Sequence, residues 1–280
     1  MVRGIHLPHE VDQIRDLEIR DSDVFVVTYP KSGTVWLQQI LLLLDSKGDM
    51  DSIAKKAVFS ITGLVPWIES NGQVQMFVKA ESPRYRVTHL PYHLMPKELI
   101  LKKGKVIYVA RNPKDVLVSF YCFHKMAKML ETPKGFDEFF DKFMRGEVGS
   151  GSWFEHIKGW ISHKDDLNML FITYEEMIQD LHTAVRRIAE FLEADLTQDQ
   201  LNSVVKHSTF KNMSQIPKSN MELMPDDMFD HKEGRFMRKG IIGDWKNHFT
   251  VAQNEQFDEI FNQEMKDFPV PFIIKDSSCI

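Results

Sequence analysis

Cysteine is scarce in this chain: Cys122 and Cys279 are the two among 280 residues. Two cysteines support neither a disulfide framework nor a metal site built from thiolates. Long apolar runs are also missing. The longest, residues 40–44, is far too short to cross a membrane, and no signal peptide is visible at the N-terminus. We therefore expect a reduced, soluble protein of the cytoplasm with no membrane partner.

Positive charge is not in excess either. The net charge is −5, which argues against nucleic-acid binding because proteins that bind nucleic acid generally carry a basic surplus. Hydrophobic residues make up 43% of the chain and charged residues 27%, as in an ordinary globular enzyme. A site for an anion must therefore be built from a local group of basic residues.

Apolar runs predict four strands, at residues 24–29, 85–90, 105–110 and 168–173. Helical patterns lie between and after them, at residues 34–44, 114–128, 136–145, 153–163 and 181–193. This alternation predicts an α/β fold with a central parallel sheet flanked by helices. No linker divides the chain, so residues 1–280 should form a single domain. Residues 214–240 lack periodicity, which is typical of a lid, a binding loop or a disordered segment.

The sequence YPKSGT lies between the first predicted strand and the helix that follows. A short turn of this kind directs backbone N–H groups and the positive end of a helix toward one point. Lys31 adds a full charge there, and Gly33 permits close approach of the backbone to a ligand. The alternative is an ordinary strand-to-helix turn capped by Ser32 or Thr34.

The YPKSGT loop is P-loop-like but is not a Walker A motif, because its lysine precedes its only glycine. No Walker B strand is visible, and ATP chemistry usually needs Mg²⁺ held by such a strand. A kinase is therefore the weaker alternative. A sulfuryl group, which carries less charge than a terminal phosphate, fits the loop better.

Other strand ends offer further polar groups. Arg111 follows the third predicted strand, and Ser119 lies about two helical turns beyond it. The pair suits the binding of a second phosphate. An ion pair of Arg111 with Asp115 is an equally good interpretation. The sequence RKG at residues 238–240 could join that phosphate site. His89 ends the second predicted strand, and the pKa of free imidazole, about 6.5, suits a general base.

Aromatic residues lie near these polar segments. Trp36, Tyr174 and Phe210 either pack in the core, the usual fate of such side chains, or stack on a purine.

These segments together resemble the cytosolic sulfotransferases. The resemblance runs from about Val24 to Phe268 and rests on the motifs TYPKSGTVW, THLP, YVARNPKDVLVSF, TYEEM, FMRKGIIGDWKNHFT and VAQNE, in the family's order. It implies transfer of a sulfuryl group from 3′-phosphoadenosine 5′-phosphosulfate (PAPS) to a small-molecule acceptor. The implied product of the donor is PAP, and no metal is implied.

The resemblance also implies roles for individual residues. His89 is the implied catalytic base, with Lys31 and Ser119 as further catalytic residues. The implied cofactor-binding residues are Lys31, Ser32, Gly33, Thr34, Val35, Trp36, Arg111, Ser119, Tyr174, Ser208, Thr209, Phe210, Met213, Arg238, Lys239 and Gly240. Residues 214–240 are the implied active-site lid. A homodimer contact is implied at Lys246, Thr250, Val251 and Glu255.

The acceptor is left open by the sequence, and phenols, alcohols including steroids, and arylamines all fit. The 20 phenylalanines and 15 methionines predict an adaptable apolar pocket. Its candidate lining residues are Phe59, Phe77, Phe120, Phe123, Met126 and Phe236. No carboxylate must pair with a cationic amine, but three stay candidates: Glu69, Glu81 and Glu131.

Two departures from the family pattern bear on the acceptor side. Val87 stands where phenol-type members often carry lysine, which predicts a more apolar pocket. The first strand also lies closer to the start of the chain than in most relatives, which predicts that part of the pocket rim is missing or rebuilt. From another functional class, a catalytically idle nucleotide-binding module is disfavoured because His89, Lys31 and Ser119 are all present.

Overall fold

The computed structural model describes residues 6–270, so Cys279 lies outside the described residues. Its centre is a parallel sheet with the strand order β2-β1-β3-β4. The strands are β1 (Val24–Thr28), β2 (Tyr85–Thr88), β3 (Lys105–Ala110) and β4 (Met169–Thr173). Each lies within two residues of a predicted run, and every pairing is parallel. The predicted α/β fold with a central parallel sheet is confirmed.

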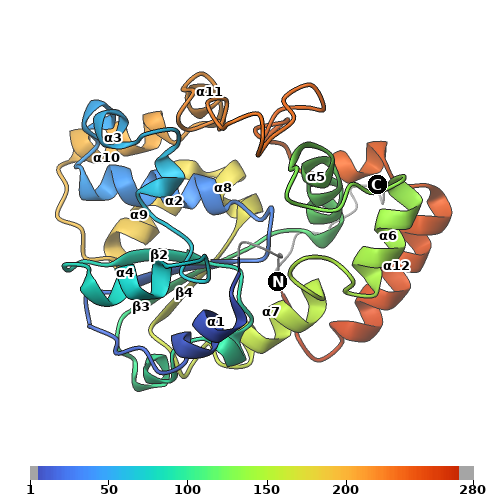
Figure 1. The fold of residues 1–280 in the computed structure, drawn as a ribbon, viewed down its shortest axis with the longest axis horizontal. Helices are drawn as coiled ribbons and strands as arrows, with labels where there is room; N and C mark the ends of the chain where they lie inside the picture. The colour runs from blue at the N-terminus through green and yellow to red at the C-terminus, as the bar shows by residue number, and fades with distance from the viewer. Residues whose placement is uncertain (1–5, 271–280) are drawn as a thin grey trace.

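Helices cover both faces of this sheet (Figure 1). One layer is formed by α2 (Thr34–Asp45), α3 (Met50–Lys56), α8 (Tyr174–Gln179), α9 (Leu181–Phe191) and α10 (Gln198–His207). The opposite layer is formed by α1 (Pro8–Ile14), α4 (Gln73–Lys79), α5 (Pro113–Met126), α6 (Phe136–Met144), α7 (Trp153–Ile161) and α12 (Val251–Glu264). The remaining short elements are α11 (Phe210–Met213), η1 (Ile61–Gly63), η2 (Tyr92–Leu94), η3 (Lys97–Leu101) and η4 (Asp244–Asn247).

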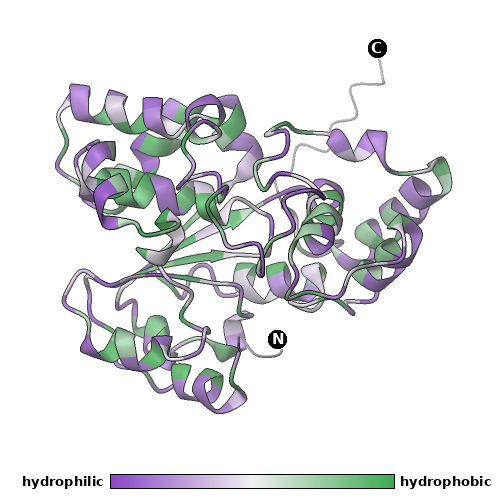
Figure 2. Ribbon diagram, turned by 45° about the horizontal axis from the view of Figure 1, so that its top comes forward, coloured by the Kyte–Doolittle hydropathy of each residue, from purple (hydrophilic) through white to green (hydrophobic). Residues whose placement is uncertain are grey.

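Strand β1 shows why the apolar runs are continuous. Val24 and Val26 pack into the core below α2 and α9, whereas Phe25 and Val27 pack into the core on the other face. A strand that is covered on both faces needs apolar residues at every position rather than at alternate ones. The strands accordingly stand out as green in the hydropathy view (Figure 2).

The five predicted helices correspond to α2, α5, α6, α7 and α9, with ends that agree within two residues. The sequence missed the shorter helices and also α12. In α12 the one buried residue is Phe257, so the periodic apolar stripe that identifies a helix is nearly absent. None of the helices in the described range has the length and apolar content needed to cross a membrane.

The chain order of the strands determines where a ligand can bind. From β1 the chain first crosses to β2 on one side and then returns to β3 on the other side of β1. In open α/β sheets, ligands bind at the carboxyl ends of the strands where the connections diverge in this way. The YPKSGT loop follows β1 and Arg111 follows β3, so both lie at this switch point.

Residues 214–240 contain no helix or strand but are well anchored. Ser219 is fully buried, and its hydroxyl donates to the Gln39 side chain at 3.0 Å. The Asp230 N–H donates to the Met126 carbonyl at the end of α5, at 2.7 Å. Figure 1 shows this segment in orange beside α5 and above the sheet. The disordered-segment alternative is therefore wrong, and a lid or binding loop is left.

Candidate active site

The loop after β1 leaves the start of helix α2 without a side-chain cap. Its N-cap is Gly33, with φ of 110°, and no side chain caps it in the described structure. The hydroxyl of Thr34 bonds to that of Thr28 at 2.7 Å, and the Ser32 hydroxyl is buried without a partner among residues 6–270. The alternative of a turn capped by Ser32 or Thr34 is wrong. The helix N-terminus, with its partial positive charge, is left available to an anion.

Lys31 places its ammonium group between two aromatic rings. Its Nζ lies 4.1 Å from the ring centre of Phe123 and 3.9 Å from that of Phe236. Burial, followed by the positive charge of Arg111, lowers the Lys31 pKa to about 7. Ring faces stabilise a cation far less than water or a carboxylate does. An anion bound at this position would therefore gain a strong partner.

Arg111 lies against the same loop. One guanidinium nitrogen donates to the Lys31 carbonyl at 2.9 Å, and the guanidinium covers the ring of Tyr174 at 4.1 Å. Its Nε is buried and has no partner in the described range. Asp115 instead accepts hydrogen bonds from the N–H groups of Gly243 and Trp245, at 2.7 and 3.0 Å. The predicted alternative, an ion pair of Arg111 with Asp115, is wrong.

The RKG segment contributes two more cations. Arg238 and Lys239 each lie 2.5 Å from one oxygen of Asp244, which is 2% exposed. Burial alone would raise the Asp244 pKa, but hydrogen bonds from Lys239, Asn247 and Arg238 hold it far below its ordinary value. One carboxylate thus faces two cations, and Arg111 adds a third. Although the chain as a whole is acidic, positive charge is concentrated at this position.

Gly240 ends the segment in the left-handed region, with φ of 65°. A Cβ atom on this residue would lie 2.2 Å from the Phe210 ring. The close approach of backbone and ring requires glycine at this position.

His89 is oriented by the end of strand β1. Its Nδ1 lies 2.7 Å from the Thr28 carbonyl oxygen, which can only accept a hydrogen bond. Nδ1 therefore carries the proton, and Nε2 keeps a lone pair. Burial lowers the His89 pKa to about 4, so the ring is neutral at pH 7. The sequence-based value, that of free imidazole, was too high because the sequence does not show this burial.

A buried carboxyl group lies behind His89. Glu69 is 1% exposed and accepts a hydrogen bond from the His89 backbone N–H at 2.8 Å. Burial raises the pKa of this carboxyl to about 7. Glu69 does not line the cavity described below, so it is not placed to contact an acceptor directly.

The aromatic residues lie at the opposite end of the loop from His89. The indole N–H of Trp36 donates to the Ser208 carbonyl at 2.6 Å, and the Trp36 ring meets Tyr174 edge-on at 5.3 Å. Trp36, Tyr174 and Phe210 all line the same cavity and so are not confined to the core. This arrangement suits the alternative of stacking on a purine better than that of simple core packing.

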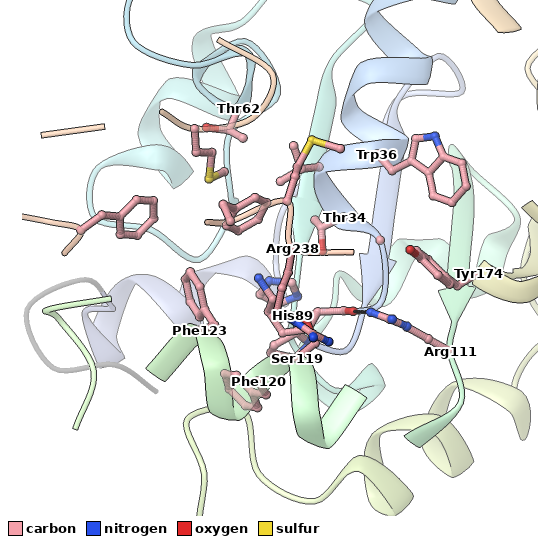
Figure 3. Close-up of a pocket in the computed structure, with 18 of the residues that line it drawn as sticks. Thr34, Trp36, Thr62, His89, Arg111, Ser119, Phe120, Phe123, Tyr174 and Arg238 are labelled. Carbon is pink, nitrogen blue, oxygen red and sulfur yellow. Dashed lines mark hydrogen bonds between the residues drawn. The ribbon is translucent and has the colours of Figure 1, made fainter. Parts of the chain in front are cut away.

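A single cavity of about 400 Å³ connects these groups. It is lined by every predicted site residue except Ser32, Ser208 and Thr209. Figure 3 shows Trp36, Tyr174 and Arg111 on one side and Phe120 and Phe123 on the other, with His89 between them. The cavity therefore has a basic, aromatic half and an apolar half that meet at His89.

The apolar half corrects part of the predicted acceptor lining. Phe120, Phe123 and Phe236 line it, as predicted. Phe77, Phe59 and Met126 do not. Phe77 is fully buried beneath the Arg84 guanidinium, Phe59 is 56% exposed, and Met126 belongs to the core. Sequence alone cannot separate these cases, because all are apolar residues in irregular or helical segments.

Several lining residues were missed, although the chain's methionine and phenylalanine content predicted the type of most of them. They are Thr62, Trp67, Met129, Leu130, Ile178, Met221, Met224, Met228, Phe229 and Met237. The clearest unused signal is the density of methionine and phenylalanine in residues 221–237, a segment without the periodicity of a helix or strand. Of the candidate carboxylates, Glu81 is exposed and Glu131 lines only a neighbouring cavity.

The residues of the predicted dimer contact lie at the surface. Thr250 caps α12 through a reciprocal pair of hydrogen bonds with Gln253. Val251 is 75% exposed, and Lys246 and Glu255 are also exposed. Within residues 6–270 there is no group of three or more His, Cys, Asp or Glu residues placed to hold a metal ion.

Comparisons with known proteins show the family of the chain. A family model described as a sulfotransferase domain matches residues 21–269. The chain is 46% identical over 265 residues to an amine sulfotransferase from Oryctolagus cuniculus, covering 94% of this chain and 87% of that protein.

Solved structures also resemble it. One is a mouse sulfotransferase complexed with PAP, with a TM-score of 0.77, 29% identity, and coverage of 94% of this chain and 91% of that one. Another is retinol dehydratase in complex with androsterone and the inactive cofactor PAP, with a TM-score of 0.82, 25% identity, and coverage of 95% and 87%.

Proposed function

Because the chain belongs to the sulfotransferase family, we propose that it transfers the sulfuryl group of PAPS to a hydroxyl or amine of a small, largely apolar acceptor, with His89 as the base. The observation that carries the proposal is the cavity itself. A site rich in hydrogen-bond donors and cations adjoins an apolar chamber, and a neutral imidazole lies where the two meet.

The loop after β1 fits the phosphosulfate end of the donor. The start of α2 has no side-chain cap, and the buried Ser32 hydroxyl lacks a partner in the described structure. Both features cost free energy unless a ligand supplies acceptors. The Lys31 ammonium, held between the rings of Phe123 and Phe236, adds the charge that a phosphosulfate requires.

The second basic group fits the 3′-phosphate. Arg111 retains a buried, unpartnered Nε within the described range, and Ser119 lines the cavity near it. Arg238 and Lys239 reach the same half of the cavity from residues 214–240. Because their shared carboxylate, Asp244, offsets only one of their two charges, a dianionic phosphate would be attracted strongly.

The adenosine is proposed to lie between the two anion sites. Ring faces and edges are provided there by Trp36, Tyr174 and Phe210, and Met213 also lines the cavity. We propose Ser208 and Thr209 as supporting residues, since Ser208 holds Trp36 through its carbonyl and Thr209 caps α11.

The chemistry follows from how each group is held. PAPS supplies an activated sulfuryl group and leaves as PAP. The lone pair on His89 Nε2 accepts the acceptor's proton, while the bond from Nδ1 to the Thr28 carbonyl keeps the ring in the required tautomer. Lys31 and the first N–H groups of α2 stabilise negative charge at the phosphate oxygen. They are fixed before the reaction, so little reorganisation is needed.

The apolar half of the cavity is proposed to bind the acceptor. Its walls combine phenylalanine rings with methionines, which adapt to ligands of different shape. The androsterone complex of a structural neighbour and the name of the amine sulfotransferase support steroids and amines as acceptor classes.

Three further proposals rest on the family resemblance. Residues 214–240 act as a lid, which their contribution of both cofactor-side and acceptor-side lining residues supports. A homodimer forms through Lys246, Thr250, Val251 and Glu255, which their exposure supports. The protein acts in the cytoplasm, as do the relatives its motifs resemble.

The test is transfer of radiolabelled sulfate from PAPS to a panel of phenols, alcohols and amines, with EDTA present and His89→Ala in parallel. We expect product from the wild type alone, with turnover in the variant about 10²–10⁴-fold lower and PAP affinity unchanged. Equal turnover in the variant would exclude His89 as the base. Loss of wild-type activity in EDTA would exclude the proposed independence of metal and reopen the kinase alternative. Tight PAP binding without transfer to any acceptor would favour the idle module.

A further inference from the structure

A second cavity, of about 220 Å³, lies next to the apolar half of the main one. It is formed by α5, α6 and the segments 129–133 and 147–149, and we call it the annex. Met129, Leu130 and Gly149 line both cavities, so the annex adjoins the acceptor end of the site. Unlike the apolar half, the annex has polar and charged walls.

His124 is the buried polar group of the annex. It is 7% exposed, and its ring packs between Phe120 and Phe139, with centre distances of 4.7 and 4.9 Å. Phe120 also lines the main cavity, so His124 lies directly behind the wall of the acceptor site.

The hydrogen bond made by one ring nitrogen of His124 determines which kind of group the other ring nitrogen can bind. Its Nδ1 lies 2.9 Å from the Glu131 carbonyl oxygen, an acceptor, so Nδ1 carries the proton. Burial lowers the His124 pKa, which favours the neutral form of the ring. Nε2 then holds a lone pair, is closed off from solvent and has no hydrogen-bond partner within residues 6–270. The group that this nitrogen needs is a hydrogen-bond donor.

The charges around the annex favour a neutral donor over an anion. Lys142 is the ammonium group on its wall, and it is engaged by Glu131 at 3.0 Å and by Glu138 at 3.2 Å. Glu147 adds a second carboxylate to the wall and is paired with Arg145 at 2.9 Å. With its one lysine already paired, the annex would repel a carboxylate or sulfate at the far end of an acceptor.

The spacing along α5 suits a two-ended acceptor. Ser119 lines the main cavity with His89, and His124 follows five residues later on the same helix. A rise of about 1.5 Å per residue puts the two about 7.5 Å apart along the helix axis, and they also lie about 140° apart around it, so their side chains are separated by more than the axial distance. An acceptor of two or more rings spans such a distance, while a single phenol does not.

We propose that the annex is a subsite for the far end of the acceptor, and that it selects acceptors with a second hydroxyl, whose O–H donates to Nε2 of His124. This proposal rests on the proposed function and narrows its substrate class. The preferred acceptors are rigid diols of two or more rings, sulfated at the hydroxyl beside His89 and held at the distal one.

The experiment compares acceptors that differ only at the distal position. The first set is 4,4′-dihydroxybiphenyl, 4-hydroxybiphenyl and 4-hydroxy-4′-methoxybiphenyl. The second is a steroid 3,17-diol and the same 3-ol without the 17-oxygen. We measure kcat/KM for sulfation and, separately, calorimetric affinity for the enzyme–PAP complex. We expect the diols to be preferred about fivefold to tenfold beyond the twofold statistical factor of the symmetric biphenyl, as one hydrogen bond allows.

Two substitutions separate the ligand contact from the structural one. His124→Asn keeps an N–H donor near Nδ1 for the Glu131 carbonyl but has no atom at Nε2. His124→Gln places an amide near Nε2 instead. We expect the diol preference to vanish in the first variant and to persist in part in the second. His182→Gln, a partly exposed histidine on α9, is the matched control and should keep the wild-type preference.

The outcomes separate the two proposals. Sulfation without a diol preference in either set would overturn the subsite and leave the proposed function intact. A binding preference that is lost in His124→Asn, without any transfer of sulfate, would support the subsite and overturn the proposed function. A methoxy group that serves as well as the hydroxyl, a preference that survives in His124→Asn, or no binding by either set would each overturn the subsite.

Discussion

The position of Lys31 predicts an unusual alkaline limit to donor capture. Burial and the neighbouring Arg111 lower the Lys31 pKa to about 7 in the protein without ligand. Above that pH, the fraction of Lys31 that carries its positive charge falls about tenfold per pH unit. The kcat/KM for PAPS, which reports the free enzyme, should therefore fall about tenfold between pH 7.5 and 8.5 and tenfold again by pH 9.5.

The same group should behave differently once the donor is bound. A nearby anion stabilises the charged form of lysine and raises its pKa. We therefore expect kcat, which reports the ternary complex, to stay level well above pH 8. On the acid side, the His89 pKa of about 4 predicts that kcat/KM keeps its full value down to about pH 5.

The assay is initial-rate sulfation from pH 4.5 to 9.5 with varied PAPS and a saturating aliphatic alcohol, whose own ionisation does not interfere. Lys31→Arg is the decisive variant, because a guanidinium group stays charged throughout this pH range. The alkaline fall in kcat/KM should therefore disappear in this variant, although its kcat should be lower. Lys211→Arg, at an exposed position, is the control and should keep the fall. A level wild-type kcat/KM up to pH 9, or an unchanged fall in Lys31→Arg, would refute the reasoning.

Two more predictions follow from single positions. Gly240→Ala should weaken PAP binding about fivefold to thirtyfold by calorimetry, because a left-handed alanine costs about 1–2 kcal/mol and its Cβ collides with Phe210. Gly243→Ala has a similar backbone, with φ of 84°, but open space around it, so an equal loss of affinity there would show that backbone strain alone is responsible. Val251→Asp should convert the proposed dimer to monomer in sedimentation experiments, because it puts two like charges across a symmetric contact. A wild type that is already monomeric would exclude the dimer.

Local sequence was enough to predict the strands and the positions of the site loops. Each strand is a short apolar run followed by a polar group, and each polar group that was named lies at the carboxyl end of the sheet. A parallel sheet gathers those ends at one edge, so the linear order of Lys31, His89, Arg111 and Tyr174 was sufficient to predict their convergence. Helices whose buried face is a single residue, as in α12, gave no comparable pattern.

The state of each group was decided by the tertiary structure. The pKa values of Lys31 and His89 depend on how fully distant segments exclude water, and no local pattern records that. The same holds for Asp115, which bonds to residues about 130 positions away rather than to Arg111, and for Phe77, which the fold buries under Arg84 instead of placing it in the cavity. Sequence determined which chemical groups meet at the sheet edge, because all strands of a parallel sheet end at that edge, although the strand order β2-β1-β3-β4 does not follow the order of the strands in the chain. Only the packing of segments far apart in the sequence decided which of those groups are charged, which stay unpartnered, and which apolar side chains face the acceptor.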